Sequence, residues 1–358
     1  MADRHHSAAG QDQSSLFTGV SEVADLSESE SVKGTPAARL PAFVLGEELA
    51  RLAAQDPRIV VLTANLASAN RTVEFQAQHP DRFFDFGIAE KNMITAAAGM
   101  AACGLVPYAA TFAAFCALLG AEQIRTDCAY PDLPVRVVGT HSGISMGFYG
   151  TSHHATEDLG MMRTIADLTV VCSTDANHLR AVLRASLDHP GALYIRLGRG
   201  RDPEVYGVVP ENLVFGRSIR LREGKDLTII ATGAEVHPAL DAAEALAADG
   251  ISVRVEDMHT VKPLDHEAVR AAAAETGAIL TVEEHNVIGG LGSAVAEVLV
   301  DLERVPFLRH GIQDHYALIG PPAALYAHYK LDASGIEEVA RALLRGEAAP
   351  STQESEQS

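Results

Sequence analysis

The chain has 358 residues, which at about 150 residues per domain predicts two domains. Its 47 acidic residues outnumber its 28 basic ones and give a formal net charge of −19, so its surface should repel nucleic acids and anionic membranes. It has no apolar run of the roughly 18 residues needed to cross a bilayer and no signal-peptide pattern, and we expect a cytoplasmic protein.

Residues 1–35 and 347–358 are rich in small polar and acidic residues without apolar periodicity, which predicts a disordered tail at each end. Between residues 36 and 205, short β-branched runs alternate with longer helical stretches, and Asp175 is placed to cap one helix. Strands are expected at 58–64, 105–112, 134–141, 168–173 and 192–198, and helices at 93–103, 155–165 and 175–189. This order predicts a parallel sheet covered by helices on both faces.

A polar segment containing Gly and Pro, residues 206–216, is the expected linker. The alternation restarts after it and continues through residues 217–346. Strands are expected at 226–233, 251–258, 278–285 and 305–311, and helices at 237–250, from Asp265, and at 290–303. The predicted fold class is therefore α/β, with two doubly wound domains whose sheets are mostly parallel.

The cysteines show neither a CxxC pair nor the spacing of a zinc site, and we expect four buried, reduced thiols. They are Cys103, Cys116, Cys128 and Cys172.

Glu90 lies in the segment FDFGIAEKNM, where a predicted strand is followed by a helix. Ligands of open α/β sheets bind at the carboxyl ends of the strands, which makes Glu90 a candidate for chemistry. An acid at a helix N-terminus also interacts favourably with the helix dipole, so position alone leaves both explanations open.

Two phenylalanines follow in the segment TFAAFCALLG. Phe112 and Phe115 are three residues apart, a spacing that puts both rings on one face of a helix. In most proteins such a pair is part of the core, so the spacing by itself does not identify a binding site.

The segment THSGISMGFYGTSHHATED places His141 at a strand end, then three glycines, then His153 and His154. Packing alone does not explain this concentration of histidine and glycine, which predicts a functional loop. No cysteine or carboxylate has ligand spacing beside these histidines, and we expect no metal site in the chain itself.

Arginines at 196, 199 and 201 follow a predicted strand, and they suit either surface ion pairs or the binding of an anionic ligand. The later segment GGLGS precedes a helix but lacks the GxGxxG spacing of nucleotide sites. Close packing at a strand-to-helix turn explains its glycines.

Taken in order, FGIAEKNM, TFAAF, the histidines twelve residues apart and LGR resemble the second half of the transketolase family. The chain is most similar to the C-terminal subunit of a split transketolase, and the resemblance extends from residue 36 to 344. It implies that residues 36–205 form the pyrimidine-binding domain of a thiamine diphosphate enzyme and that residues 217–346 form the transketolase C-terminal domain.

The resemblance also implies roles for the cofactor-binding residues. Glu90 matches the acid that hydrogen-bonds N1′ of the aminopyrimidine and favours its 4′-imino tautomer, which takes a proton from the thiazolium. Phe115, assisted by Phe112, matches the ring that stacks on the pyrimidine. Asn65 stands near the thiazolium, where many members of the family have Asp.

The remaining matches concern the substrate. His141 and His153 match the contacts to donor-sugar hydroxyls that also relay protons, with His154 beside them, and Arg199 matches an arginine that binds a substrate phosphate. Tyr149 replaces an Asp that reads a substrate hydroxyl in enzymes acting on sugar phosphates. Asn65 is a second departure from the family pattern. The third is Leu40, which stands where an arginine is expected, with Arg39 one residue away. Together these departures leave the identity of the substrate open.

The diphosphate of the cofactor needs a Mg²⁺-bound anchor, which in this superfamily is a GDG followed by Asn residues. This chain contains no GDG and no Asn pair. The resemblance therefore implies an N-terminal partner subunit that carries this motif and holds the diphosphate and Mg²⁺, in an α2β2 heterotetramer.

The favoured interpretation is a subunit of an enzyme that transfers a two-carbon ketol unit from a ketose donor to an aldehyde. One alternative is the beta subunit of a 2-oxo acid dehydrogenase or of a related decarboxylating synthase. A third is a catalytically silent scaffold subunit, which the presence of Glu90, Phe115 and His153 disfavours.

Overall fold

The computed structural model describes residues 41–199 and 203–347. The predicted tails, apart from Glu347, lie outside these residues, as do Arg39, Leu40 and Arg201. In the described part of the chain, the helices are too short or too polar to cross a membrane.

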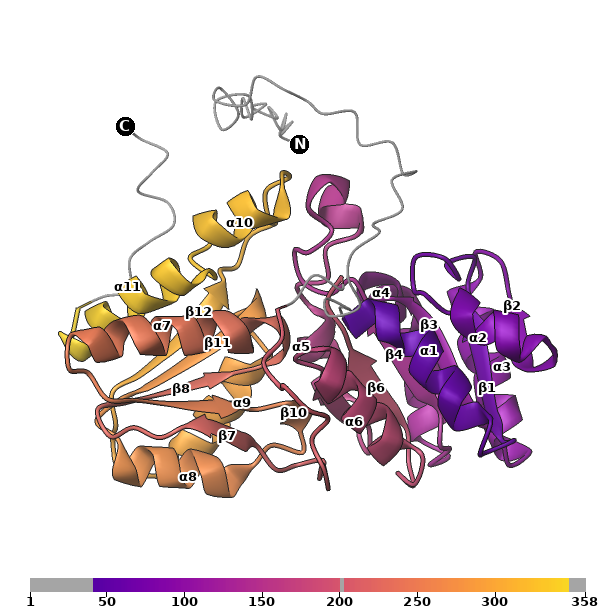
Figure 1. Ribbon diagram of the computed structural model, residues 1–358, viewed down its shortest axis with the longest axis horizontal. Helices are drawn as coiled ribbons and strands as arrows, with labels where there is room; N and C mark the ends of the chain where they lie inside the picture. The colour runs from indigo at the N-terminus through magenta and orange to yellow at the C-terminus, as the bar shows by residue number, and fades with distance from the viewer. Residues whose placement is uncertain (1–40, 200–202, 348–358) are drawn as a thin grey trace, which may run out of the picture. The chain divides into compact units, whose positions relative to one another are not determined.

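Seven strands form the first sheet, in the order β10-β5-β6-β4-β3-β1-β2 (Figure 1). They are β1 (Ile59–Thr63), β2 (Phe83–Asp85), β3 (Val106–Phe112), β4 (Arg136–Thr140), β5 (Thr169–Cys172), β6 (Leu193–Arg196) and β10 (Thr260–Lys262). Strands β1 to β6 run parallel, and β1 and β4 are completely buried, as the inner strands of a sheet covered on both faces must be, whereas the edge strand β2 leaves Phe84 and Asp85 exposed. The edge strand β10 is antiparallel to β5.

Helices cover both faces of this sheet. They are α1 (Pro41–Ala53), α2 (Val73–Gln78), α3 (Glu90–Ala102), α4 (Ala113–Gln123), α5 (Asp158–Thr164) and α6 (Ala176–Ser186). Apolar side chains of α1 and α6 form one buried cluster with the sheet, and those of α3, α4 and α5 form another. Helix α6 begins after Asp175, whose carboxylate accepts the N–H of His178, so the predicted cap is confirmed.

Five strands form the second sheet, in the order β12-β11-β8-β9-β7. They are β7 (Ile219–Arg222), β8 (Leu227–Ala231), β9 (Val253–Asp257), β11 (Ile279–Asn286) and β12 (Phe307–Ile312), with only β7 antiparallel among them. The helices are α7 (Val236–Ala248), α8 (His266–Glu275), α9 (Leu291–Leu299), α10 (Pro322–His328) and α11 (Ala333–Leu344). The α/β fold with two mostly parallel sheets is confirmed.

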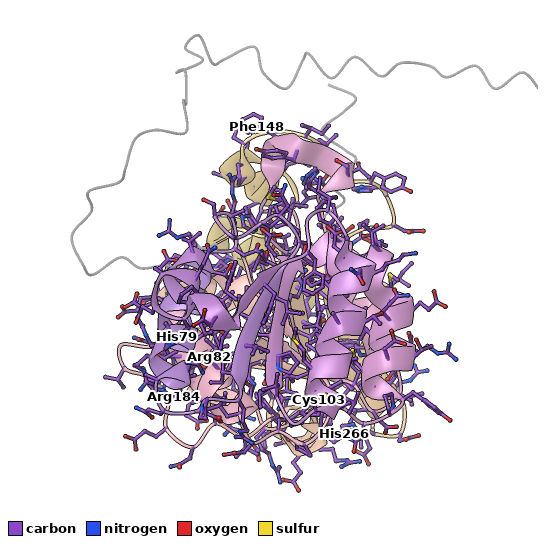
Figure 2. The ribbon with its side chains drawn as sticks, turned by 90° about the vertical axis from the view of Figure 1, so that its right-hand side faces the viewer. His79, Arg82, Cys103, Phe148, Arg184 and His266 are labelled. Atoms are coloured by element: carbon purple, nitrogen blue, oxygen red, sulfur yellow. The ribbon has the colours of Figure 1, made fainter. Side chains whose placement is uncertain are left out.

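Several features differ from the expectations, and β7 and the helices α1, α2, α10 and α11 were not predicted. Strand β10 follows β9 of the second sheet in sequence but pairs with β5 of the first, and its three residues were not predicted as a strand. Cys103 is exposed, so the expectation of four buried thiols is wrong for this one, which lies at the C-cap of α3. Figure 2 shows Cys103 at the end of the molecule opposite to Phe148.

Candidate active site

Five neighbouring parallel strands of the first sheet, β2, β1, β3, β4 and β6, end at one edge. A residue singled out in the sequence stands at or just after the end of each strand. In sheet order these residues are Glu90, Asn65, Phe112, His141 and Arg199. The topology therefore brings residues that are far apart in the sequence to the carboxyl edge of one sheet, where open α/β folds bind ligands.

Glu90 is the first residue of α3, and its side chain is buried, with 5% of its surface exposed. Within the described residues its carboxylate has no hydrogen-bond partner. Burial, with smaller contributions from the charges of Asp158 and Glu90, raises the pKa of the Cys116 thiol in α4, which places Glu90 close to that helix. A buried carboxylate without a protein partner is costly unless a ligand bonds to it.

Phe112, Phe115, His141, Tyr149 and His153 form one aromatic–histidine cluster. The ring centroids of Phe112 and Phe115 are 5.6 Å apart, and those of Phe112 and His141 are 4.4 Å apart. The His153 ring lies 5.3 Å from Phe115 and 5.1 Å from Tyr149. Phe112 is the last residue of β3 and the N-cap of α4, so the rings meet at a strand-to-helix junction rather than on one helix face.

His141 is buried and carries no charge at neutral pH. Burial, together with the positive charges of Arg199 and His153, lowers its pKa to about 4. The Thr140 hydroxyl donates to Oδ1 of Asn70 at 2.7 Å, so Nδ1 of His141, 2.9 Å from the same hydroxyl oxygen, is the donor of that pair. The lone pair of Nε2 is then the one that can accept a hydrogen bond from a ligand.

The loop between His141 and His153 contains the 3₁₀ segment η4 (Gly147–Ser152). Tyr149 is 54% exposed, and Phe148 stands at the exposed end of this loop (Figure 2). Nδ1 of His153 lies 2.8 Å from the hydroxyl oxygen of Ser152. The loop therefore presents an imidazole and a phenol together beside the Phe115 ring.

His154 and Asn65 are placed differently from the cluster. His154 is buried, and its Nε2 lies 3.2 Å from the carbonyl oxygen of Gly147, a contact that holds the loop. Asn65 is exposed, has a φ of +58°, and donates its backbone N–H to the Asp85 carboxylate at 2.9 Å. The side chain of Asn65 is thus accessible, whereas that of His154 packs inside the loop.

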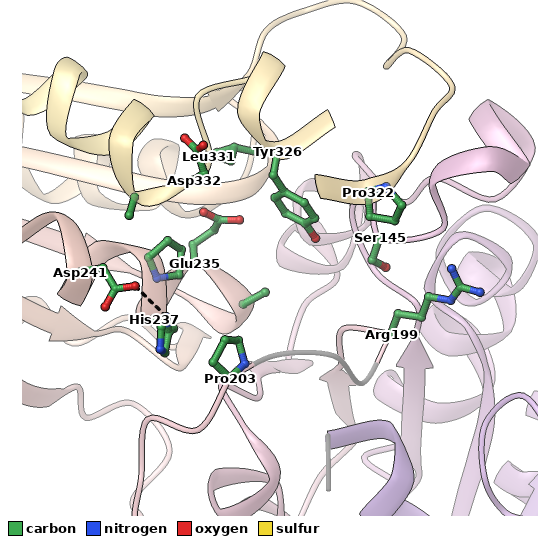
Figure 3. A pocket seen from close by; sticks show the side chains of 13 residues that line it. Ser145, Arg199, Pro203, Glu235, His237, Asp241, Pro322, Tyr326, Leu331 and Asp332 are labelled. Carbon is green, nitrogen blue, oxygen red and sulfur yellow. Dashed lines mark ion pairs between the residues drawn. The ribbon is translucent and has the colours of Figure 1, made fainter. Parts of the chain in front are cut away.

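Arg199 lines a pocket of about 270 Å³ together with residues from both sheets. Figure 3 shows Arg199 and Ser145 on one side, Glu235 and His237 on the other, and the Tyr326 hydroxyl directed toward Ser145. Glu235, His237 and Tyr326 were not identified as pocket residues from the sequence. No motif marks them, and they line the pocket only because the two sheets pack together.

Arg196, three residues earlier, is a structural residue. It is buried, its Nε lies 2.7 Å from Oδ2 of Asp158, and it also donates to two backbone carbonyls. The glycines of GGLGS also have a packing role, because a β-carbon at Gly290 would lie 1.9 Å from Oε2 of Glu283. Nowhere in residues 41–199 and 203–347 do three His, Cys, Asp or Glu side chains gather as a metal site would require.

Comparisons with known proteins show the family to which both parts of the chain belong. Residues 42–203 match the family model described as transketolase, pyrimidine binding domain, and residues 216–336 match that described as transketolase, C-terminal domain. The chain is 42% identical to the 6-deoxy-6-sulfo-D-fructose transketolase subunit SqwH of Clostridium sp. (strain MSTE9) over 82% of this chain and 90% of that protein.

Two further proteins are similar over most of their length. An apulose-4-phosphate transketolase subunit of Phocaeicola vulgatus is 37% identical, over 81% of this chain and 93% of its own. A solved structure described as "Split gene transketolase, inactive beta4 tetramer" superposes with a TM-score of 0.77 at 40% identity, covering 86% of this chain and 96% of that one.

Proposed function

The chain belongs to the transketolase family as the C-terminal subunit of a split enzyme, and from this premise we propose that its aromatic–histidine cluster and Glu90 form half of a thiamine diphosphate site. The proposed reaction transfers a two-carbon ketol unit from a ketose to an aldehyde. The observation that carries the proposal is the buried Glu90 carboxylate, which has no protein partner within the described residues and lies at the edge where Phe115 is also found.

These residues fit the aminopyrimidine half of the cofactor. Glu90 offers a carboxyl group to a ring nitrogen, and Phe115, which is only partly buried, offers a ring face for stacking. Asn65 is accessible at the same edge for the thiazolium side. When bound, thiamine diphosphate supplies a nucleophilic carbon and stabilises the negative charge left when a carbon–carbon bond of the donor breaks.

The neutral His141 accepts a hydrogen bond from a donor hydroxyl through Nε2, because its Nδ1 proton is held by Thr140. His153, on the loop across from His141, binds a second hydroxyl of the donor and exchanges a proton with that hydroxyl. The Tyr149 ring lies tilted beside His153 and offers one phenol hydrogen bond. Arg199, which lines the adjoining pocket and lies near His141, attracts an anionic group of the substrate.

A second subunit completes the site in this proposal. The described residues hold no metal-binding group, and the sequence has no GDG segment, so the diphosphate and Mg²⁺ are assigned to an N-terminal partner. A solved relative described as an inactive β4 tetramer supports this assignment. The proposed assembly is an α2β2 heterotetramer in the cytoplasm, with the domain boundary in residues 206–216.

The test is turnover by the chain reconstituted with its partner subunit, thiamine diphosphate and Mg²⁺. Ketose donors paired with an aldehyde acceptor should give ketol transfer without release of CO₂. Release of CO₂ from 2-oxo acids, with no ketol transfer, would instead support a dehydrogenase subunit or a decarboxylating synthase. No turnover by a complex that binds the cofactor would support a silent scaffold.

A further inference from the structure

The loop that carries His153 is closed at its base by an antiparallel bridge between Gly143 and Ala155. The N–H of Gly143 donates to the carbonyl of Ala155 at 3.1 Å, and the N–H of Ala155 donates back to the carbonyl of Gly143 at 2.8 Å. This base lies two residues after His141 and two residues after His153. Its position therefore determines where both imidazoles stand.

Glu284 of β11, in the second sheet, contacts this base. Its Oε1 accepts the backbone N–H of Ile144 at 2.8 Å and the hydroxyl of Tyr326 at 2.5 Å, and the side chain is only 2% exposed. A β-carbon at Gly143 would lie 2.0 Å from Cδ of Glu284, so this approach requires glycine, which the φ of +59° at that position also favours.

Arg196 of β6 fixes the other side of the base. Its Nη2 donates to the carbonyl of Ala155 at 3.1 Å and to the backbone carbonyl of Glu284 at 2.9 Å. Asp158 holds the same guanidinium in a buried ion pair. Hydrogen bonds to ionised groups in such a buried setting are stronger than those between neutral groups, so the base is held from both sheets.

The segment between β12 and α10 limits the far end of the loop. A β-carbon at Gly147 would lie 2.6 Å from the carbonyl oxygen of Gly320, and one at Gly150 would lie 2.7 Å from the Ile319 side chain. Helix α10 begins just after this segment and lies beside η4 (Figure 1). The histidine loop is thus enclosed by the carboxyl-terminal part of the chain at its base and at its far end.

We propose that Glu284 is a positioning residue for the reaction: by fixing the N–H of Ile144 it sets the loop that carries His153 and the strand end that carries His141. The inference rests on the proposed function for its kinetic consequence. It gives the C-terminal domain, which contributes none of the residues of the aromatic–histidine cluster, an indirect part in binding the substrate, through the position of the two histidines.

The first test compares three variants as complexes with the partner subunit. Glu284→Ala should lower kcat/KM for the ketose donor at least tenfold per bound thiamine diphosphate, because a buried hydrogen bond to a charged group is lost. Glu284→Gln keeps an amide oxygen that can accept from Ile144 and should stay within about threefold of the wild type. Cofactor affinity should be unchanged in both.

The matched control is Glu283→Ala. Glu283 is the preceding residue of β11, is equally buried, and accepts the backbone N–H groups of Leu291 and Gly292 within its own domain. Its loss should lower thermal stability without lowering kcat/KM per folded complex. Equal kinetic losses in Glu283→Ala and Glu284→Ala would overturn the proposal, because the effect would then be one of general stability.

The second test does not depend on activity. Hydrogen exchange of the Ile144 amide in the isolated chain should be at least tenfold faster in Glu284→Ala than in wild type or Glu283→Ala, because Glu284 accepts that N–H. If Glu284→Ala does not fold, the same measurement is made on Glu284→Asp, whose side chain is one methylene shorter and holds the carboxylate farther from the Ile144 N–H. Unchanged exchange at Ile144 would overturn the proposal, whereas an inactive wild-type complex would count only against the proposed function.

Discussion

Phe112 and His141 lie with ring centroids 4.4 Å apart although they end different strands. The register of the sheet explains this contact, because Phe112 of β3 is directly paired with Thr140 of β4 and His141 follows at once. His141 has a φ of +57°, which turns its side chain out of the strand direction. The aromatic and histidine halves of the candidate site are therefore joined by two adjacent strands.

Glu90→Gln should lower turnover of the reconstituted complex about 10²–10⁴-fold, the usual effect of losing general acid–base participation, because an amide cannot share an acidic proton with a ring nitrogen. Thermal stability should be unchanged or higher, since the carboxylate lost is buried and has no partner among the described residues. Steady-state kinetics and a melting curve check both.

The control for that variant is Glu267→Gln. Glu267 is also an acid in the first turn of a helix, α8, but it is exposed and pairs with Arg217. It should leave turnover unchanged. If Glu90→Gln behaved like Glu267→Gln, the helix dipole would be a sufficient account of Glu90.

The isolated chain should bind thiamine diphosphate negligibly. Glu90 and Phe115 are assigned only to the aminopyrimidine end, the sequence has no GDG segment, and the described residues hold no cluster of three His, Cys, Asp or Glu side chains for the Mg²⁺ that neutralises the diphosphate. Calorimetric titration with cofactor and Mg²⁺ should give measurable heat only after the partner subunit is added. Tight binding by the chain alone would contradict the shared site.

The pH dependence of stability should carry a contribution from His141. Its pKa is about 4 in the folded chain and about 6.5 when unfolded, so between these values the unfolded chain binds more protons. The free energy of unfolding should therefore fall as the pH is lowered from 6.5 to 4. The glutamine in His141→Gln binds no proton between pH 6.5 and 4, so the melting temperature of this variant should fall less steeply as the pH is lowered.

Melting curves of wild type and His141→Gln at pH 7 and pH 5 measure this difference. His266→Gln, which removes an exposed histidine of α8, serves as the control and should retain the wild-type slope. Parallel slopes for all three proteins would mean that His141 is not buried in its neutral form.

The positions of several site residues could be predicted because they depend on local patterns. The alternation of strands and helices places Glu90 at a helix start and His141 at a strand end, and Asp175 carries the signal of a helix cap. The contact of Glu284 with Ile144 joins residues 140 positions apart, and β10, which follows β9 of the second sheet in sequence, pairs with β5 of the first sheet. Such pairings depend on how the two sheets pack, and no periodicity encodes them.

Arg199→Ala should raise KM for phosphorylated or sulfonated substrates and leave neutral ones nearly unchanged. Arg199 lies beside the cluster, close enough to lower the pKa of His141, and lines a pocket of about 270 Å³. For the phosphorylated aldehyde of a matched pair, kcat/KM should fall by a factor equivalent to about 1.5–3 kcal/mol, the value of one hydrogen bond to a charged group. Matched aldehydes with and without a phosphate provide the measurement.

Tyr149→Asp should shift the preference of the enzyme toward polyhydroxylated aldehydes. The Tyr149 ring lies 5.1 Å from His153 and is more than half exposed, so its phenol is in position to meet a substrate held by that histidine. A phenol packs against an apolar or deoxygenated carbon and donates one hydrogen bond, whereas an ionised Asp accepts hydrogen bonds from hydroxyls. The ratio of the kcat/KM values for hydroxylated and deoxygenated aldehydes should change by a factor equivalent to about 1.5–3 kcal/mol. This is the value of one hydrogen bond to a charged group.

The control for substrate choice is Phe148→Ala, which changes the neighbouring exposed side chain of the same loop without adding a charge. It should leave the ratio unchanged. Because the preference is a ratio of two substrates on one enzyme, a general loss of activity cancels from it. An equal loss for both classes of aldehyde in Tyr149→Asp would show that Tyr149 supports the loop without selecting the substrate, and the preference would then have to come from Arg199 or from the partner subunit.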